Sequence, residues 1–184
     1  MDGFPDIFIA DPLIGTIADD HDGPTPTKPG EIHIIYGGFA SDGVDFDSSY
    51  DEVIKATDKD LGFGLDMKMA DVIATYAGPE LIVAAPSING FGDGDDLGKI
   101  YIYSRIDGAW KVVQTLTDQI IELKCGDVTG DEKIDLVVNS LSTGDHNDTR
   151  DEYALKVYVG SDNGFSKDNV MVGPRFISGE PGWK

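Results

Sequence analysis

The sequence predicts an all-β fold made of about three four-stranded antiparallel sheets, and three observations lead to this prediction. Short apolar runs rich in β-branched residues recur along the 184-residue chain, each directly after an acidic residue. A second run, with alternating aromatic or β-branched residues, follows each of them after a polar loop. The 23 glycines and 9 prolines supply many turns, which suits short strands better than long helices.

The paired runs define the predicted strands of each repeat. The first run of a pair is short and bounded by turn residues, as is typical of a buried strand. The second run is separated from it by a loop rich in Gly and Asp, where insertions are tolerated. The acidic residues are Asp6, Glu80 and Asp135, the first runs are 7–10, 81–84 and 136–139, and the second runs are 30–37, 98–103 and 154–160.

The spacing of the repeat predicts the architecture. Asp6, Glu80 and Asp135 are 74 and then 55 residues apart, close to the length of a four-stranded propeller blade with long loops. Three blades do not close a ring, so we expect a segment of a larger β-propeller whose open blade edges favour self-association. The predicted divisions are 1–60 for an N-terminally truncated first blade, 61–120 for the second, 121–181 for the third and 182–184 for the start of another.

One stretch and the two ends of the chain leave alternatives open. Residues 50–56 are weakly amphipathic and read equally as a short helix, an outer strand or a loop. The N-terminal residues lack the basic and apolar regions of a secretory signal, so the protein either stays inside the cell or is a piece of a longer chain.

The charge of the chain excludes several partners. With 34 acidic and 14 basic residues the formal net charge is −20, which repels nucleic-acid backbones and anionic membrane surfaces and attracts cations. No run of 18 apolar residues is present, so membrane insertion is not expected. Cys125 is the only cysteine and follows the pattern of a small buried apolar residue rather than a nucleophile.

Residues 127–135 form the most informative segment, because oxygen-bearing side chains fall at its positions 1, 3, 5 and 9. A hard cation such as Ca²⁺ takes six to eight oxygen ligands from a chain that curls around it. Gly130 gives the backbone freedom for that turn. The alternative is an acidic, solvated β-turn, since Asp and Gly are common in turns for local reasons. The predicted ligands are the side chains of Asp127, Thr129, Asp131 and Asp135 and the backbone carbonyl of Lys133.

Two other segments resemble this loop in part. The N-terminus matches its second half, with Asp2 and Asp6 as side-chain ligands and Phe4 as a carbonyl ligand, so a partial metal site is predicted there. The segment 71–80 keeps an acidic residue at each end but has one extra residue and no carboxylate between them. We expect no tight ion in it, and expect Tyr76 and Pro79 to pack the turn instead.

These motifs resemble the FG-GAP repeats of integrin α-subunit propellers and related bacterial surface proteins. Phe63-Gly64 and Ala84-Ala85-Pro86 are the closest matches to the naming motifs, with Ala84 in place of glycine. The third repeat, which opens with the segment 126–131, is similar to the VCBS-type repeat. The resemblance implies a β-propeller with mainly structural calcium ions in loops on one face and ligand contacts on loops of the other.

The function that this resemblance implies is calcium-stabilised binding or adhesion outside the cell or at its surface. The expected partner is a protein or glycan ligand held by blade loops, and the chain itself is not expected to be an enzyme. Two alternatives remain: the propeller portion of a secreted hydrolase or lyase, similar to phospholipases or polysaccharide lyases, and a lectin. No acid-base pair stands out from the general acidity.

Overall fold

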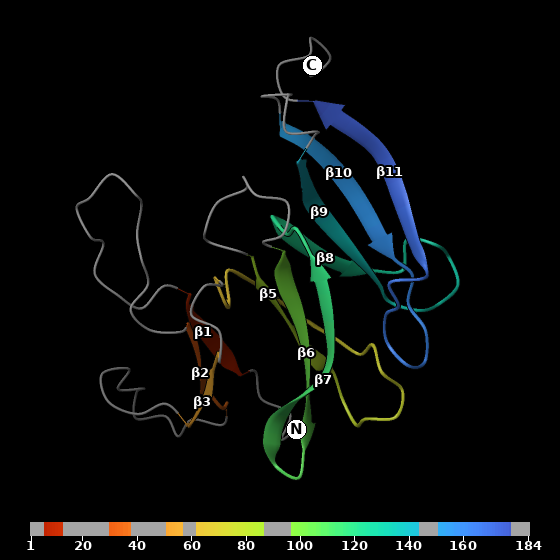
Figure 1. Cartoon of the computed structure of the whole chain (residues 1–184). Coiled ribbons are helices and arrows are strands. Elements are labelled where there is room, and N and C mark those ends of the chain that lie inside the picture. The colour runs from red at the N-terminus through yellow and green to blue at the C-terminus, as the bar shows by residue number, and fades with distance from the viewer. Residues whose placement is uncertain are drawn as a thin grey trace, which may run out of the picture. The chain divides into compact units, whose positions relative to one another are not determined.

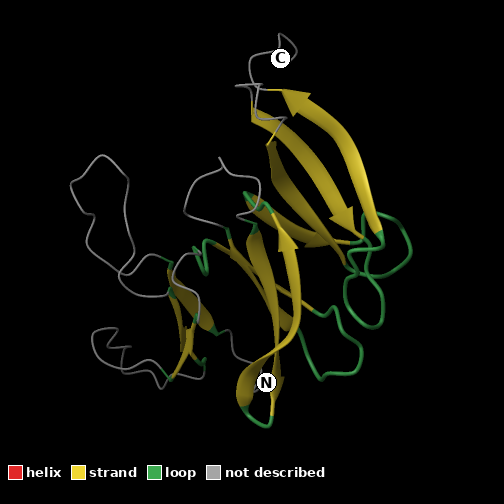
Figure 2. Cartoon of the chain, viewed as in Figure 1, coloured by secondary structure: helices red, strands yellow, loops and turns green. Residues whose placement is uncertain are grey.

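The computed structural model describes residues 6–12, 30–37, 51–56, 62–86, 97–143 and 151–177. Within these ranges every regular element is a β-strand, and the strands form three antiparallel sheets of three or four strands (Figure 1). No helix occurs among the described residues (Figure 2). The all-β prediction is therefore confirmed. The chain divides into two compact units, Met1–Leu65 and Asp66–Lys184.

The first unit holds a three-stranded sheet with the order β1-β2-β3. Its inner side chains, Ile32, Ile34 and Ile54, are buried, whereas Ile9 and Val53 on the other face are exposed. The segment 50–56 with the ambiguous pattern contributes a strand, paired with β2. A fourth strand is not seen among the described residues of this unit. The strands are β1 (Ile7–Asp11), β2 (Glu31–Ile35) and β3 (Glu52–Lys55).

The Phe63-Gly64 pair has a clear physical role in the first unit. Phe63 is fully buried, and Gly64 has a backbone φ of +89° that side chains rarely adopt. A Cβ at Gly64 would also lie 2.8 Å from the Cβ of Ala10. The motif thus joins a core anchor to a turn that requires glycine.

The second sheet has the order β4-β5-β6-β7 and contains the most buried strand of the described chain. All six residues of β5 are buried, which explains why the strand reads as a continuous apolar run rather than an alternating one. Asp107 and Gly108 have φ values of 54° and 81° and form the tight turn between β6 and β7. The strands are β4 (Asp66–Ala70), β5 (Glu80–Ala85), β6 (Gly98–Ile106) and β7 (Ala109–Asp118).

The third sheet has the order β11-β10-β9-β8, so each strand again pairs with its neighbour in sequence. The β9–β10 pairing runs without a register shift from Leu136 opposite Tyr158 to Thr143 opposite Asp151. An irregularity between Ala154 and Lys156 interrupts the β10–β11 pairing. The strands are β8 (Glu122–Gly126), β9 (Asp135–Thr143), β10 (Asp151–Tyr158) and β11 (Val170–Ile177).

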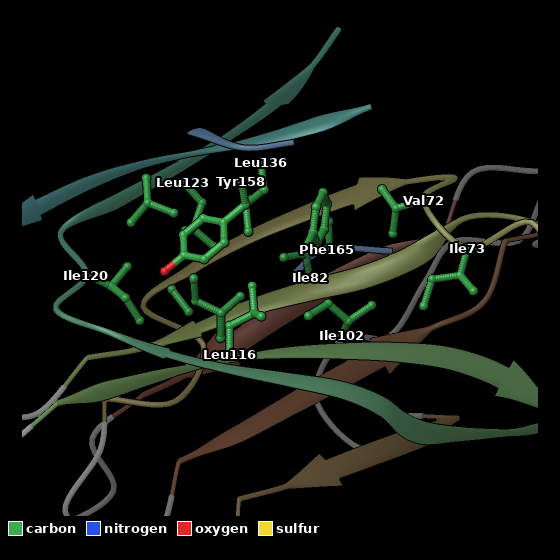
Figure 3. Packing of buried hydrophobic residues seen from close by; sticks show 13 residues of the cluster. Val72, Ile73, Ile82, Ile102, Leu116, Ile120, Leu123, Leu136, Tyr158 and Phe165 are labelled. Carbon is green, nitrogen blue, oxygen red and sulfur yellow. The ribbon is translucent and has the colours of Figure 1, made fainter. Parts of the chain in front are cut away.

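The hydrophobic core of the second unit lies between the second and third sheets (Figure 3). Ile82 and Ile102 from the second sheet pack in one cluster with Leu123 and Leu136 from the third. These four side chains are fully buried, and the burial of each stabilises the fold by roughly 1.5–3 kcal/mol.

Two loops join this core and tie the sheets together at one end. Ile73, from the β4–β5 loop, forms a β-bridge with Asn163 from the β10–β11 loop. The side chain of Gln114 on β7 accepts a hydrogen bond of 3.1 Å from the backbone N–H of Phe165 and also donates one to its carbonyl. The two loops are therefore held by backbone contacts as well as by apolar packing.

A buried polar network links the end of β7 to the third sheet. Asp118 accepts hydrogen bonds from the hydroxyls of Tyr158, at 2.5 Å, and Ser140, at 3.2 Å, and pairs with the ammonium group of Lys156. Burial and the bond to Asp118 both raise the pKa of Tyr158, which keeps the phenol protonated. The carboxylate is compensated on all sides, so it supports the sheet junction rather than presenting a reactive group.

Candidate functional site

The loop between β8 and β9, residues 127–134, curls around the carboxylate of Asp127. Asp127 Oδ1 accepts hydrogen bonds from the N–H groups of Gly130, at 2.6 Å, and Asp131, at 3.2 Å, while Oδ2 accepts one of 2.9 Å from Glu132. Gly130 and Glu132 have φ values of 80° and 64°, which bend the chain sharply. One carboxylate thereby organises most of the loop backbone.

Asp131 and Lys133 extend this arrangement toward a neighbouring loop. Asp131 Oδ1 accepts a hydrogen bond of 3.0 Å from the Lys133 N–H. The Lys133 ammonium group pairs with Asp162 in the β10–β11 loop, and this bond and charge raise the pKa of Lys133. The lysine side chain thus points to a partner outside the loop, which leaves its backbone carbonyl as the group for the predicted ligand position.

Asp135 lies beneath the loop at the first position of β9 and is fully buried. Its Oδ2 accepts hydrogen bonds from the N–H groups of Val128, at 2.9 Å, and Thr129, at 3.0 Å, and its Oδ1 accepts one of 2.8 Å from Gly160. Burial by itself raises the pKa of a carboxyl, but these bonds outweigh it and lower the pKa of Asp135 below its usual value. Asp135 therefore anchors both the loop and the end of β10 as a buried carboxylate.

Gly160 is required for this anchor because of its close approach to the loop. A Cβ at Gly160 would lie 2.2 Å from the backbone oxygen of Ile134, a distance that real Cβ atoms do not show. Any side chain here would push the Gly160 N–H away from Asp135. Gly160 was not among the residues predicted for the site, and its only signal in the sequence is a glycine at the end of the predicted second run, 154–160.

The predicted ligands of the third repeat have the donor atoms that a hard cation prefers, but their side chains are not gathered around one point. The donors are oxygens on a sharply curled loop, and each carboxylate keeps lone pairs beyond those that accept N–H bonds. Across the described ranges, however, no three His, Cys, Asp or Glu side chains gather into a group that could hold a metal ion. Asp127 and Asp131 shape the exposed loop, whereas Asp135 serves the backbone below it. Ca²⁺ at Asp127, Thr129, Asp131, Lys133 and Asp135 stays a prediction.

The acidic residue that precedes each first run accepts backbone hydrogen bonds in all three repeats, whereas the sequence predicted metal ligation for Asp6 and Asp135 and no tight ion at Glu80. Asp6 Oδ1 accepts a hydrogen bond of 2.9 Å from Gly37, after β2, as Asp135 does from Gly160 after β10. Glu80 Oε2 accepts hydrogen bonds from Val72, at 2.9 Å, and Ile73, at 3.1 Å, in the preceding loop. The available signal was the recurrence of an acid at the same place in every repeat. The other N-terminal candidates, Asp2 and Phe4, lie outside the described residues.

The β4–β5 loop differs from the β8–β9 loop in what fills it. Val72 and Ile73 are buried, and Tyr76 is half-buried against the hydrophobic core. The packing role predicted for Tyr76 is therefore confirmed, while Pro79 is also half-buried. Both loops are held from below by an acidic anchor, but above it apolar side chains fill this loop whereas hydrogen bonds to Asp127 organise the other.

Burial raises the pKa of the Cys125 thiol to about 11, with the nearby Lys68 opposing that effect, so the thiol is protonated at neutral pH. Across the described part of the chain, no helix has the length and apolar content needed to cross a membrane.

In comparisons with known proteins, no family model, no curated protein and no solved structure matches the chain.

Proposed function

We propose that the chain is a segment of a calcium-binding β-propeller of the FG-GAP or VCBS repeat type that serves as a binding module. Each of the three antiparallel sheets would be one blade, with boundaries at 1–60, 61–120 and 121–181. The proposal is supported by the sequential strand order in every sheet and by the recurring acidic anchor at Asp6, Glu80 and Asp135. A sheet order that follows the chain is the connectivity of a propeller blade.

The calcium part of the proposal depends on one observation, which is the set of three hydrogen bonds that Asp127 accepts from its own loop. We call Asp127 the hub of this loop. A carboxylate that accepts three N–H groups of its own loop holds the chain in a tight curl, and a curled loop with oxygen-bearing side chains is the kind of segment that Ca²⁺ binds. Ca²⁺ bound there would supply positive charge to a chain of net charge −20 and would tie the loop to β9. The ion would be structural, and the contacts with a protein or glycan partner outside the cell would fall to blade loops.

Titration with CaCl₂ in a calorimeter, together with thermal unfolding, tests this proposal. We expect a dissociation constant on the order of 10⁻⁴ to 10⁻³ M, as in extracellular calcium modules. At 100 times the dissociation constant, calcium should stabilise the fold by about 2.7 kcal/mol, and a chelator should remove the gain. Asp131→Ala should abolish the response. Asp168→Ala, which removes an exposed carboxylate elsewhere, should retain it; equal responses in the two variants would refute the assigned loop.

A further inference from the structure

A cavity of about 350 Å³ opens at the end of the second and third sheets where the candidate calcium loop lies. Its walls come from the β4–β5 loop, the β8–β9 loop and the β10–β11 loop, which leave the same end of the two sheets (Figure 1). This volume lies within the range of roughly 300–1,000 Å³ that is usual for ligand pockets. The cavity is thus large enough for a side chain or small molecule and far larger than a bare ion.

The lining of the cavity combines apolar groups with carboxylates. Val72 is buried, and Ile134 and Tyr76 are half-buried, so these three residues supply apolar surface. Asp71 and Glu132 line the same cavity, and within the described residues neither carboxylate has an ion pair or a side-chain hydrogen bond. In the described part of the chain, two carboxylates without an ion pair or hydrogen bond therefore stand beside an apolar surface and an aromatic ring, and the charge of Glu132 also acts on the neighbouring Lys133.

A third carboxylate of the cavity shows which chemistry its walls accept. Asp162 is already paired with the ammonium group of Lys133, and both residues line the cavity. Anionic ligands are disfavoured, because three acidic side chains outnumber the single lysine in the lining. The cavity is also much larger than a single metal ion, and part of its wall is apolar, which suits an organic group better than an ion. An organic cation with an apolar stem complements both the carboxylates and the apolar surface of this lining.

We propose that this cavity binds the lysine or arginine side chain of a partner polypeptide. The alkyl stem of such a side chain covers apolar surface while its charged head stays at the polar rim, which matches Val72 and Ile134 beside Asp71 and Glu132. The ring of Tyr76 adds a face for cation–π contact. The inference rests on the proposed binding function and specifies the chemistry of its partner, but it places this contact beside the candidate calcium loop rather than on the other face that the resemblance implies. It also gives the candidate calcium loop a second role, because Glu132 and Lys133 form part of the wall.

The test uses the full chain labelled with ¹⁵N and two probes, Nα-acetyl-lysine amide and Nα-acetyl-arginine amide. We expect amide shifts confined to residues 71–76, 132–134 and 161–162, with dissociation constants on the order of 1 mM. The neutral counterparts, Nα,Nε-diacetyl-lysine amide and Nα-acetyl-citrulline amide, should not bind. Binding of the neutral probes with equal affinity, or shifts spread over the acidic surface, would overturn the proposal.

A matched pair of double variants separates the cavity from the general acidity. Asp71→Asn with Glu132→Gln should weaken probe binding by about tenfold or more, because both unpaired carboxylates are lost. Glu122→Gln with Asp168→Asn changes the net charge equally at positions outside the cavity and should leave binding unchanged. Equal weakening in both would show nonspecific attraction. Cadaverine serves as a free diamine, and binding of cadaverine without binding of either blocked amino acid would overturn the polypeptide assignment.

The calcium proposal and the cavity proposal fail in different measurements. Loss of probe binding in the double variant with an intact calcium titration would support the cavity and leave the calcium loop in place. Probe binding in a chain that takes up no calcium would support the cavity while refuting the calcium function. A calcium response with no probe binding would refute the cavity alone.

Discussion

The β4–β5 and β8–β9 loops present the same anchor with different contents. In both, the first residue of the following strand is a fully buried acid, Glu80 or Asp135, that accepts hydrogen bonds from two successive N–H groups at the start of the loop. Above Glu80 the loop is filled by buried Val72 and Ile73, whereas above Asp135 it is organised by Asp127 and is largely exposed. The same anchor therefore occurs beneath a loop filled by apolar side chains and beneath a loop organised by hydrogen bonds to Asp127.

The largest effect is expected from removing the anchor of the third repeat. Asp135→Ala leaves the N–H groups of Val128, Thr129 and Gly160 without their carboxylate and should lower the free energy of unfolding by about 3–5 kcal/mol. Urea unfolding in calcium-free buffer measures this loss. Asp168→Ala should stay within about 0.5 kcal/mol of the parent. A small loss at Asp135 without calcium would show that the residue matters only as a metal ligand.

The anchor of the second repeat should contribute somewhat less, because it accepts two N–H groups instead of three. Glu80→Ala should lower the free energy of unfolding by about 2–4 kcal/mol. Glu80→Gln keeps a carbonyl acceptor for Val72 and Ile73 and serves as the matched variant, with a smaller loss expected. The same urea titration decides between them, and an equal loss for Ala and Gln would contradict a role for the acceptor oxygen.

The filling of the second loop should have an intermediate effect that does not depend on calcium. Tyr76→Ala removes a half-buried ring from the edge of the core and should destabilise the fold by about 1–3 kcal/mol. Thermal unfolding with calcium and with chelator should give the same loss. A loss that appears only in the presence of calcium would link this loop to the ion and break the contrast between the two loops.

The smallest effect is expected from pH, and its sign follows from Asp135. Because its pKa is lower in the folded state than in the unfolded chain, its contribution is complete well above the unfolded value of about 3.9. That contribution should be lost as the pH falls below about 4 and through the lower folded pKa. Stability measured between pH 6 and pH 2.5 should fall more steeply in the parent than in Asp135→Asn. Parallel profiles would show that Asp135 has no special share in acid sensitivity.

Much of the secondary structure could be predicted because it depends on local pattern. The runs at 7–10, 81–84 and 136–139 are strands, since β-branched residues bounded by turns favour that conformation without distant partners. The stretch 50–56 was ambiguous because four strand residues are too few to show a period. Its pairing with β2 decided the outcome.

The candidate site was predicted in its residue types and only partly in their roles. Asp127, Thr129, Asp131 and Asp135 could be selected because oxygen-bearing residues at odd spacing stand out in a single short segment. The sequence could not predict that Asp127 is a hub and Asp135 a buried anchor. Gly160, which donates a hydrogen bond to Asp135, lies 25 residues away in the chain. The anchoring role of Glu80 could not be predicted either, because its partners are backbone N–H groups, which leave no signal in the sequence.

By itself the sequence determined the strand-rich architecture, the recurring acid and the oxygen-bearing residues of the segment 127–135, because each depends on residues that are close together in the chain. The tertiary structure alone decided which backbone groups those acids hold, how Asp118 meets Tyr158, and that three separate loops enclose one cavity. The physical reason is that burial and hydrogen bonding are fixed by packing between segments far apart in sequence, and a local pattern carries no record of which segments meet.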